Sequence, residues 1–587
     1  PVQLRVREYN SLNQLTLTVT YETSPDETDL DFEPGKPCEF FYLDDRLSGQ
    51  TGMSVLPVQC FVERVGEGVM TVAVPNQNAL KSLRAQAHNH LLGIHLCVDS
   101  TSYQIMRESL HAAMRSENEK FIRLRDTLIG PLHPRFRQLP KLSFPWLNES
   151  QNAAIQKCIE AQDVSVVHGP PGTGKTTTLV EAIIETLQRE VQVMVCAPSN
   201  AAVDWISEQL MRRGVNVLRI GNPLRISDEM LNCSYERRYG AHPDYPELWS
   251  IRKMLREKPS PKLRHRAEEL EIKINMEVFE AARVVACTLT GAGYHILDHR
   301  RFSTLFIDEA AQALEPACWT AILKADRVIL GGDHWQLPPT VKCPECVKAG
   351  LDRTLMQHIV KEKPACVSLL TVQYRMHRDI MGFSSQWFYH GQLTAAPEVA
   401  ERLVNHMDTA LCWIDTSAMD FSEKESQRSA SKLNSQEARL LVHVLRDYVE
   451  MIGLERLQND RVDFGIISPY KAQVRLIRKL LKMQKFYRGL RRQVSVNTVD
   501  GFQGQERDVV IISMVRDNDQ GTIGFLRDLR RMNVALTRAR MKLIVLGNVE
   551  TLARHPFYRQ LIEYFKERGD FLQPQPEGEA YSQPNPA

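Results

Sequence analysis

Residues Gly169–Thr176 read GPPGTGKT and place the tightest constraint on how this chain folds. The pattern G-x-x-x-x-G-K-[ST] forms a loop whose backbone N–H groups surround anionic phosphates. Lys175 would reach the β- and γ-phosphates, and the Thr176 hydroxyl would bind Mg²⁺. Val164–Val167 reads as a short buried strand before the loop, and Thr177–Leu187 as a helix with apolar periodicity after it. A chance glycine-rich turn would lack these flanks, so the sequence predicts a nucleotide-binding α/β domain.

Size and composition set broad limits on the class of the protein. The 587 residues are too many for one hydrophobic core, and 43% hydrophobic with 25% charged residues is typical of soluble proteins. A net charge of +2 does not by itself indicate a nucleic-acid partner. We find no signal peptide and no long apolar span in the sequence, so no membrane association is predicted.

Cysteine usage favours a reducing compartment. The 12 cysteines are scattered, and Cys196, Cys287 and Cys366 lie in apolar runs, as reduced buried thiols do. A cytoplasmic or nuclear location is therefore predicted. The chain begins at Pro1 rather than Met, so we expect that flanking domains, with protein partners of their own, can lie outside it.

Changes in hydrophobic pattern divide the chain into segments. Residues 1–100 predict a small β-barrel, with strands at Leu15–Tyr21, Cys38–Tyr42, Pro57–Arg64 and Gly68–Val74. Residues 101–146 predict a helical stalk, drawn as one long exposed helix over Ser102–Arg125, and a Pro-rich linker. Alternating strands and helices predict a first α/β domain in two parts, 147–224 and 283–364, separated by a helical insertion at 225–282. A second α/β domain follows at 365–570, and the Pro-rich tail 571–587 is predicted to be disordered.

Two acids follow an apolar strand at Thr304–Glu309. A carboxylate at the end of such a strand can hold the hydration shell of Mg²⁺, and the next can orient or deprotonate an attacking water. We assign Asp308 to Mg²⁺ and Glu309 to the water. A second strand runs into the loop at 332–339, where Gln336 offers a neutral amide suited to sensing a γ-phosphate.

Phosphoryl transfer also needs positive charge where the leaving phosphate becomes more negative. Arg375 and Arg538 are the candidates, and both lie in the second α/β domain. A single arginine is more often a solvated or ion-paired surface residue. These two can reach the nucleotide if the second α/β domain faces the first, with ATP between the two domains.

Eight motifs in order resemble those of a superfamily 1 helicase of the up-frameshift-like group. The matches cover about residues 147–565: LNESQ at 147–151, GPPGTGKT at 169–176, APSNAAVD at 197–204, DEAAQ at 308–312, GDHWQLPP at 332–339, QYRMH at 373–377, TVDGFQGQE at 498–506 and NVALTRAR at 533–540. The resemblance implies an α/β fold of two tandem RecA-like P-loop domains, with an N-terminal small β-barrel on helical stalks and a helical insertion in the first motor domain. It also implies an ATP- and Mg²⁺-dependent monomer that moves 5′ to 3′ along single-stranded RNA or DNA and unwinds duplexes.

The resemblance also implies roles for individual residues. Gln151 would read the adenine edge, Tyr374 would stack on the base, and Glu506 would approach the ribose. Gln336, Arg375 and Arg538 would meet the γ-phosphate, while Lys175, Asp308 and Glu309 complete the catalytic set, with Thr176 and Asp308 holding the metal. The remaining nucleotide contacts would be Gly169, Pro170, Gly172, Thr173, Gly174 and Thr177. The strand's backbone would lie along Pro198, Ser199, Asn200, Thr288 and Thr498.

Several alternatives stay open. An ATP-gated clamp that binds RNA and scaffolds other proteins would use the same motifs with little unwinding. A small-molecule kinase explains the phosphate loop but leaves the second α/β domain and both arginines without a role. Cys343 and Cys346 have the spacing of a zinc knuckle without a second pair nearby, and the basic run at 479–492 is more simply a solvated helix face. The sequence does not choose between RNA and DNA.

Overall fold

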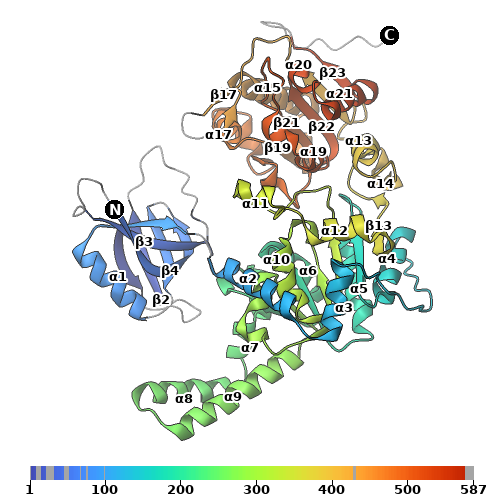
Figure 1. Ribbon diagram of the computed structural model, residues 1–587. Helices are drawn as coiled ribbons and strands as arrows, with labels where there is room; N and C mark the ends of the chain where they lie inside the picture. The colour runs from blue at the N-terminus through green and yellow to red at the C-terminus, as the bar shows by residue number, and fades with distance from the viewer. Residues whose placement is uncertain are drawn as a thin grey trace. The chain divides into compact units, whose positions relative to one another are not determined.

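Figure 1 shows the computed structural model, which describes residues 2–7, 15–21, 32, 34–44, 52–66, 68–74, 77–97, 100–426 and 431–574. The predicted disordered tail lies outside the described residues from 575 onward, and its first residues belong to the strand β23 (Asp570–Leu572). Within the described part of the chain, no helix is both long enough and apolar enough to cross a membrane.

The N-terminal strands close into a β-barrel, as predicted. Its antiparallel strands follow the order β1-β2-β5-β4-β3-β6. They are β1 (Val2–Arg7), β2 (Leu15–Tyr21), β3 (Pro37–Asp44), β4 (Gly52–Gly66), β5 (Val69–Val74) and β6 (Leu92–Leu96). Leu17 of β2 pairs with Val72 of β5, and both side chains are fully buried, as alternation along a barrel strand requires. The sequence analysis missed β1, β6 and the helix α1 (Gln77–Asn89).

The single helix predicted over Ser102–Arg125 is wrong. The chain forms α2 (Ser100–Arg115) and α3 (Glu119–Leu128) instead. Oδ1 of Asn118 accepts a hydrogen bond of 3.1 Å from the backbone N of Phe121, which starts a new helix in the way that N-cap residues do. The α3 helix is partly buried, whereas the sequence predicted an exposed helix. Phe121 is buried and packs edge-on against Trp319 of α10 (Glu315–Ile322), with ring centroids 6.2 Å apart.

The first α/β sheet has the strand order β13-β7-β12-β11-β8-β10-β9. Its strands are β7 (Val164–His168), β8 (Val193–Ala197), β9 (Val217–Ile220), β10 (Val284–Thr288), β11 (Phe302–Ile307), β12 (Ala325–Gly332) and β13 (Val367–Leu369). The β7 and β8 strands are buried along their whole length, which is typical of parallel strands covered on both faces. Because β13 pairs with β7, this sheet uses residues beyond the predicted start of the second domain at 365.

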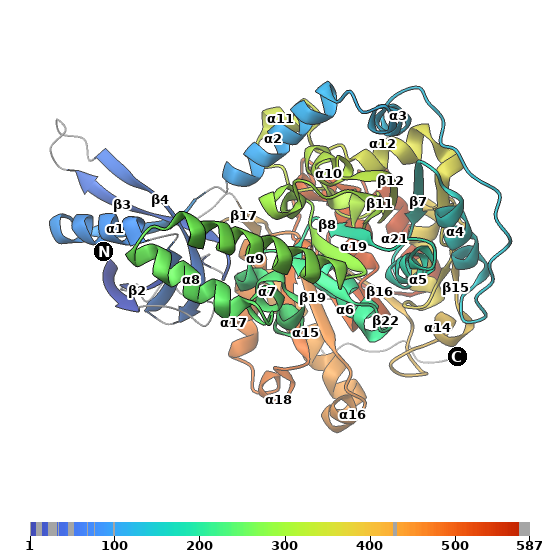
Figure 2. The ribbon, with the colours of Figure 1, turned by 90° about the horizontal axis from the view of Figure 1, so that it is seen from below.

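Helices connect these strands. They are α4 (Glu149–Glu160), α5 (Lys175–Leu187), α6 (Asn200–Arg212), α11 (Pro344–Lys348) and α12 (Leu355–Glu362), in addition to α10. The insertion before β10 contains α7 (Tyr235–Gly240), α8 (Tyr245–Glu257) and α9 (Pro261–Glu280), of which α8 and α9 lie side by side (Figures 1 and 2). The ion pair between Arg252 and Glu271, with N and O 2.7 Å apart, joins those two helices.

The second sheet has the strand order β20-β19-β21-β22-β16-β23 and is parallel. Its strands besides β23 are β16 (Leu411–Asp415), β19 (Phe464–Ser468), β20 (Val494–Thr498), β21 (Arg507–Ser513) and β22 (Ala539–Gly547). The helices are α13 (Arg378–Phe388), α14 (Pro397–Ala400), α15 (Ser435–Ile452), α16 (Leu454–Asn459), α17 (Lys471–Lys482), α18 (Tyr487–Leu490), α19 (Leu529–Leu536), α20 (Val549–Leu552) and α21 (Pro556–Arg568).

This second sheet separates two hydrophobic cores. Val510 and Ile512 of β21 belong to one core, together with Trp413, and Ile511 between them belongs to the other. A strand whose alternate side chains enter different cores is covered on both faces, which is the arrangement of an α/β domain. The mixed α/β class, the barrel and the helical insertion therefore agree with the predicted fold.

Candidate active site

The phosphate loop connects the end of β7 to the start of α5. Gly172 and Gly174 have φ angles of 77° and 75°, a conformation that favours glycine. The buried Thr173 closes the turn by donating from Oγ1 to the carbonyl of Pro170 at 2.7 Å. The helix begins at Lys175, two residues earlier than the sequence indicated, so its first N–H groups follow directly from the loop.

Lys175 meets both predicted acids. Its Nζ lies 2.7 Å from Oδ1 of Asp308 and 2.5 Å from Oε1 of Glu309, and its side chain is only 12% exposed. Burial acts to lower the pKa of Lys175, but the two carboxylates outweigh burial and hold the pKa above its usual value. A cation and two acids thus converge where the motif places the γ-phosphate, and an incoming phosphate would compete with those acids for the lysine.

Glu309 is held by an unusual backbone. Its φ of 53° lies in the left-handed region, which is rare for a residue with a side chain. Oε2 of Glu309 accepts a hydrogen bond of 2.6 Å from Nε2 of Gln312, while Oε1 contacts Lys175. Each oxygen of the carboxylate therefore has its own partner. The 3-10 turn η5 (Ala310–Gln312) follows at once, so this short turn presents the second acid.

Gln336 is positioned by a buried aspartate that the sequence analysis did not single out. Asp333, at 2% exposure, accepts hydrogen bonds from Nε2 of Gln336 at 2.9 Å and from the hydroxyl of Tyr389 at 2.7 Å. Its other oxygen lies 3.0 Å from Nε2 of His168, the residue before the phosphate loop. Burial acts to raise the pKa of Asp333, yet the bonds from His168, Tyr389 and Gln336 hold it below the usual value. An ionised Asp333 therefore ties Gln336 to the strand that leads into the loop.

One of the two predicted arginines, Arg375, lies against the phosphate loop. The backbone N of Tyr374 donates to the carbonyl of Gly172 at 2.8 Å, which brings the QYRMH segment against the loop. Arg375 then pairs with Glu506, with Nε and Oε2 2.5 Å apart. Glu506, predicted to approach the ribose, is thus engaged with an arginine in this structure.

Arg538 is buried, at 2% exposure, and hydrogen-bonds to three neutral oxygens: the carbonyls of Val534 and Gln505 and the hydroxyl of Thr537. Burial, and next the nearby Arg375, lower the pKa of Arg538 to about 9. A buried cation beside a second cation is energetically costly. An anion such as phosphate would therefore stabilise Arg538.

The predicted base contacts have other partners here. Asn148 and Gln151 form a capping box at the start of α4: Oδ1 of Asn148 accepts from N of Gln151, and Oε1 of Gln151 accepts from N of Asn148. Nε2 of Gln151 donates to the carbonyl of Thr173 at 3.2 Å. Tyr374 is 46% exposed, and its hydroxyl accepts a bond of 3.0 Å from Asn148. Gln151 is thus adjacent to the phosphate loop, with its amide already bonded.

The nucleotide residues fall in one compact unit, composed of residues 126–185, 307–315 and those from 327 onward. Thr176 is half-buried and Thr177 exposed at the start of α5. Pro198, Ser199, Asn200 and Thr288 belong to the other compact unit, and Thr498 belongs to the first-named one.

The predicted strand contacts occupy equivalent turns in the two sheets. In the first sheet Thr288 ends β10 in register with Ala197 of β8, which places it beside Pro198 and Ser199. Its Oγ1 accepts from N of Gly291 at 3.1 Å. In the second sheet Thr498 ends β20 in register with Ser468 of β19, and its Oγ1 accepts from N of Gly501 at 3.4 Å. The same threonine-capped turn therefore closes one strand in each sheet.

Among the described residues, one group of three His, Cys, Asp or Glu side chains has ligand atoms within 4.8 Å of each other: His168, Asp333 and His334. Cys343 and Cys346 are not part of such a group, and the Cys343 thiol instead lies 3.3 Å from a carboxylate oxygen of Glu345. Within the described part of the chain, no set of three or four zinc ligands forms around Cys343 and Cys346.

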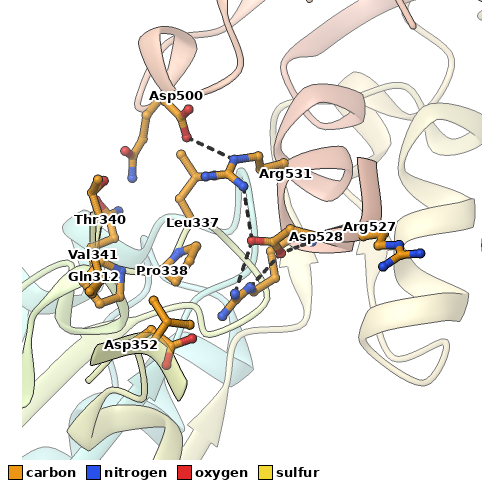
Figure 3. A pocket seen from close by; sticks show the side chains of 14 residues that line it. Gln312, Leu337, Pro338, Thr340, Val341, Asp352, Asp500, Arg527, Asp528 and Arg531 are labelled. Carbon is orange, nitrogen blue, oxygen red and sulfur yellow. Dashed lines mark hydrogen bonds and ion pairs between the residues drawn. The ribbon is translucent and has the colours of Figure 1, made fainter. Parts of the chain in front are cut away.

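A pocket of about 620 Å³ is lined by the loop that follows Gln336 (Figure 3). The Pro-rich loop 337–341 forms one wall, with Gln312, Val347 and Asp352. The other wall is Asp500, Gln503, Arg527, Asp528, Arg530 and Arg531. Arg531 lies between Asp500 and Asp528, at 3.5 Å and 3.6 Å respectively.

Comparison with known proteins gives matches to family models over most of the two α/β domains. Two family models, each described as an AAA domain, match residues 146–261 and 247–344 in one case and 351–550 in the other. The chain is 34% identical to the DNA-binding protein SMUBP-2 of Mesocricetus auratus over 507 residues, which are 80% of this chain and 50% of that protein.

Two fission yeast proteins extend the comparison. Identity is 33% to the DNA polymerase alpha-associated DNA helicase A of Schizosaccharomyces pombe, over 87% of this chain and 80% of that protein. It is also 33% to the ATP-dependent helicase upf1 of the same organism, over 80% of this chain and 52% of that protein. The chain thus spans about half the length of the SMUBP-2 relative and most of the length of helicase A.

Proposed function

This chain belongs to the up-frameshift-like group of superfamily 1 helicases, and we propose that it hydrolyses ATP to move along single-stranded nucleic acid and separate duplexes. The observation that carries the proposal is the convergence of Lys175 with Asp308 and Glu309, in the same compact unit as Arg375 and Arg538. Phosphoryl transfer needs that combination: a cradle for phosphate, a base for water and positive charge for the leaving group.

The role of each side chain follows from its contacts. ATP phosphates would replace the carboxylates around Lys175 and bring negative charge to the arginine pair. Glu309, released from the lysine, would accept a proton from the attacking water, while Gln336 orients that water or the γ-phosphate. Arg538, with no carboxylate among its hydrogen-bond partners named above, would gain most from the charge that develops in the transition state.

A divalent metal fits the residues at this site. The hydroxyl of Thr176 and the carboxylate of Asp308 are oxygen ligands, which Mg²⁺ prefers. Thr176 is the last residue of the phosphate-loop motif, and Asp308 contacts Lys175 of that motif. When bound, the metal would neutralise part of the negative charge of the nucleotide phosphates. The protein's own contribution is to place a carboxylate oxygen of Asp308 2.7 Å from Nζ of Lys175.

The strand would run along the threonine-capped turns at Thr288 and Thr498, with Pro198, Ser199 and Asn200 beside the first. Travel from 5′ to 3′ is the direction that the family implies. The two α/β domains would alternate their grip as ATP binds and is hydrolysed. We propose that the protein acts as a monomer in the cytoplasm or nucleus, in keeping with 12 free cysteines.

The test is ATPase activity with single-stranded RNA, with single-stranded DNA and without either, followed by unwinding of duplexes that carry a 5′ or a 3′ overhang. Stimulated hydrolysis with unwinding from one overhang supports the helicase. Stimulated hydrolysis without unwinding of either duplex would favour the alternative, an ATP-gated clamp. Hydrolysis that responds to no strand would argue against both.

A further inference from the structure

An exposed aromatic ring lies in the second α/β domain, which also contains Thr498, one of the predicted contacts to the single strand. Phe525 is 57% exposed and belongs to the short 3-10 helix η8 (Gly524–Arg527). Its ring packs edge to face on Tyr470, with centroids 5.6 Å apart and an interplanar angle of 61°. Tyr470 is itself buried, so the exposed ring stands on a ring that belongs to the core.

The position of Tyr470 ties Phe525 to Thr498. Tyr470 comes two residues after Ser468, the last residue of β19, and Ser468 pairs in register with Thr498 at the end of β20. The two strands are parallel, so both end at the same edge of the sheet. Ligands of α/β proteins bind outside this carboxyl edge. Phe525 is therefore supported at the same edge as Thr498.

Hydrogen bonds hold both the ring that supports Phe525 and the backbone next to Phe525. Nη1 of Arg516 donates to the hydroxyl of Tyr470 at 3.3 Å, which orients the supporting ring. On the other side, the hydroxyl of Tyr558 donates to the carbonyl of Leu526 at 2.7 Å. An aromatic ring held in this way loses little freedom when a flat partner stacks on it, which makes stacking more favourable.

Arginines follow Phe525 along the chain. Arg527, Arg530 and Arg531 line the pocket of Figure 3 with three aspartates, and Arg530 and Arg531 both pair with Asp528. Arg531 reaches Asp500, two residues beyond Thr498, at 3.5 Å. Arg531 thus joins the threonine-capped turn to the segment that carries Phe525, and all of these residues belong to one compact unit. Proteins that hold single strands combine basic side chains for phosphates with aromatic rings on which bases stack.

We propose that Phe525 is a stacking platform for one base of the single strand whose backbone passes Thr498. The proposal rests on the strand binding described under Proposed function and adds a contact to a base where the other predicted contacts reach the backbone. Because every base has a flat face, such a platform gives affinity without sequence preference. Single exposed apolar side chains are common on proteins. Phe525 differs in its fixed support and in its place beside Thr498.

The experiment compares binding of an ordinary single-stranded oligonucleotide with binding of the same strand in which several consecutive positions lack bases. Fluorescence anisotropy measures Kd for the full chain and for Phe525→Ala, Phe525→Leu and Phe525→Trp. Met451→Ala is the matched control, since Met451 is 47% exposed on α15.

For the ordinary strand we expect Phe525→Ala to raise Kd roughly 5- to 100-fold, the usual range for loss of one base–aromatic stack. Phe525→Leu should behave like the alanine variant, because it keeps apolar area but not a flat ring, and Phe525→Trp should retain affinity. On the strand lacking bases, all variants should match the wild type, which also shows that they are folded.

Equal losses on both kinds of strand, or affinity kept by leucine as well as by tryptophan, would overturn the stacking role. A wild-type protein that binds neither strand would instead overturn the proposed function itself, so the two failures are distinguishable.

Discussion

Tyr389 donates its hydroxyl hydrogen to Oδ2 of Asp333 across 2.7 Å, and both side chains are buried. The same hydroxyl oxygen accepts a bond of 3.0 Å from Nδ2 of Asn533. Asn533 lies on α19, and Arg538 follows the end of that helix. Asp333 in turn holds Gln336. The Tyr389–Asp333 bond therefore joins the amide predicted to sense phosphate to the helix that precedes the predicted arginine finger.

We expect Tyr389→Phe to lower kcat for ATP roughly 10- to 150-fold with KM changed less than threefold. The variant removes one hydrogen bond to a buried carboxylate, and such bonds contribute about 1.5–3 kcal/mol. Steady-state ATPase kinetics with a saturating single strand measure both constants. Tyr448→Phe is the control, because it removes a comparable Tyr–Asp bond of 2.8 Å, to Asp408, away from the nucleotide residues. Equal effects of the two variants would show a general loss of stability.

Lys175→Ala should abolish ATP turnover and leave nucleotide-free strand binding intact. The lysine ammonium contacts Asp308 and Glu309, and its removal leaves the γ-phosphate without its cation. ATPase rate and fluorescence anisotropy without nucleotide measure the two properties. Turnover within a few-fold of the wild type would contradict the assignment of the phosphate loop.

Glu309→Gln should trap ATP. Loss of a general base slows hydrolysis by about a hundredfold or more. The amide can still accept from Gln312, and the Lys175–Asp308 pair remains, so binding should survive. Titration with a fluorescent ATP analogue gives affinity, and single-turnover hydrolysis gives the rate. A variant that no longer binds ATP would place Glu309 in a different role.

Arg538→Ala should lower turnover about a thousandfold, the scale of arginine fingers in other phosphoryl-transfer enzymes. Arg538→Lys should recover little, since lysine cannot reproduce the fork that bonds to Val534 and Gln505. The measurement is single-turnover hydrolysis at saturating ATP, with thermal unfolding to compare stability. Turnover of the alanine variant within tenfold of the wild type would remove Arg538 from the phosphate site.

Much of the architecture could be predicted from local pattern. The strand Leu15–Tyr21 occurs at the predicted residues, and Val164–His168 extends the predicted strand by one residue. Runs of β-branched and apolar residues that are largely buried in a sheet leave a clear signal. The break at Asn118 was missed because the charged residues on either side are compatible with one helix. Its capping bond is visible only in three dimensions.

The candidate site shows the same division. Lys175, Asp308 and Glu309 were assigned by motif, and the structure brings them together. Tyr389 stands outside every motif and carries no signal of its own in the sequence. Asp333 and Asn533 are within quoted motifs, and their partnership depends on Tyr389, which lies between them in space. Long-range partners of buried polar groups depend on the packing of distant segments, which no local pattern encodes.

Glu437 gives the fold a pH dependence that can be isolated. Its side chain is fully buried on α15, where Oε1 accepts from Ser513 at 2.5 Å and from the backbone N of Val515 at 2.9 Å. Burial raises the pKa of Glu437 to about 7, against opposing hydrogen bonds. The folded state thus holds this proton more tightly than the unfolded chain. This contribution to stability is present at about pH 4.5 and below, and is lost as the pH rises towards about 7 and above.

Glu437→Gln should remove that dependence while it keeps the acceptor for Ser513 and Val515. Relative to the wild type, the variant should gain roughly 3 kcal/mol of stability between pH 4.5 and pH 8, from a shift of about 2.5 pKa units. Thermal or urea unfolding of both proteins across this range measures the difference, and groups that titrate in both proteins cancel. A difference between variant and wild type that stays constant with pH would show that Glu437 is ionised in the folded state throughout the range.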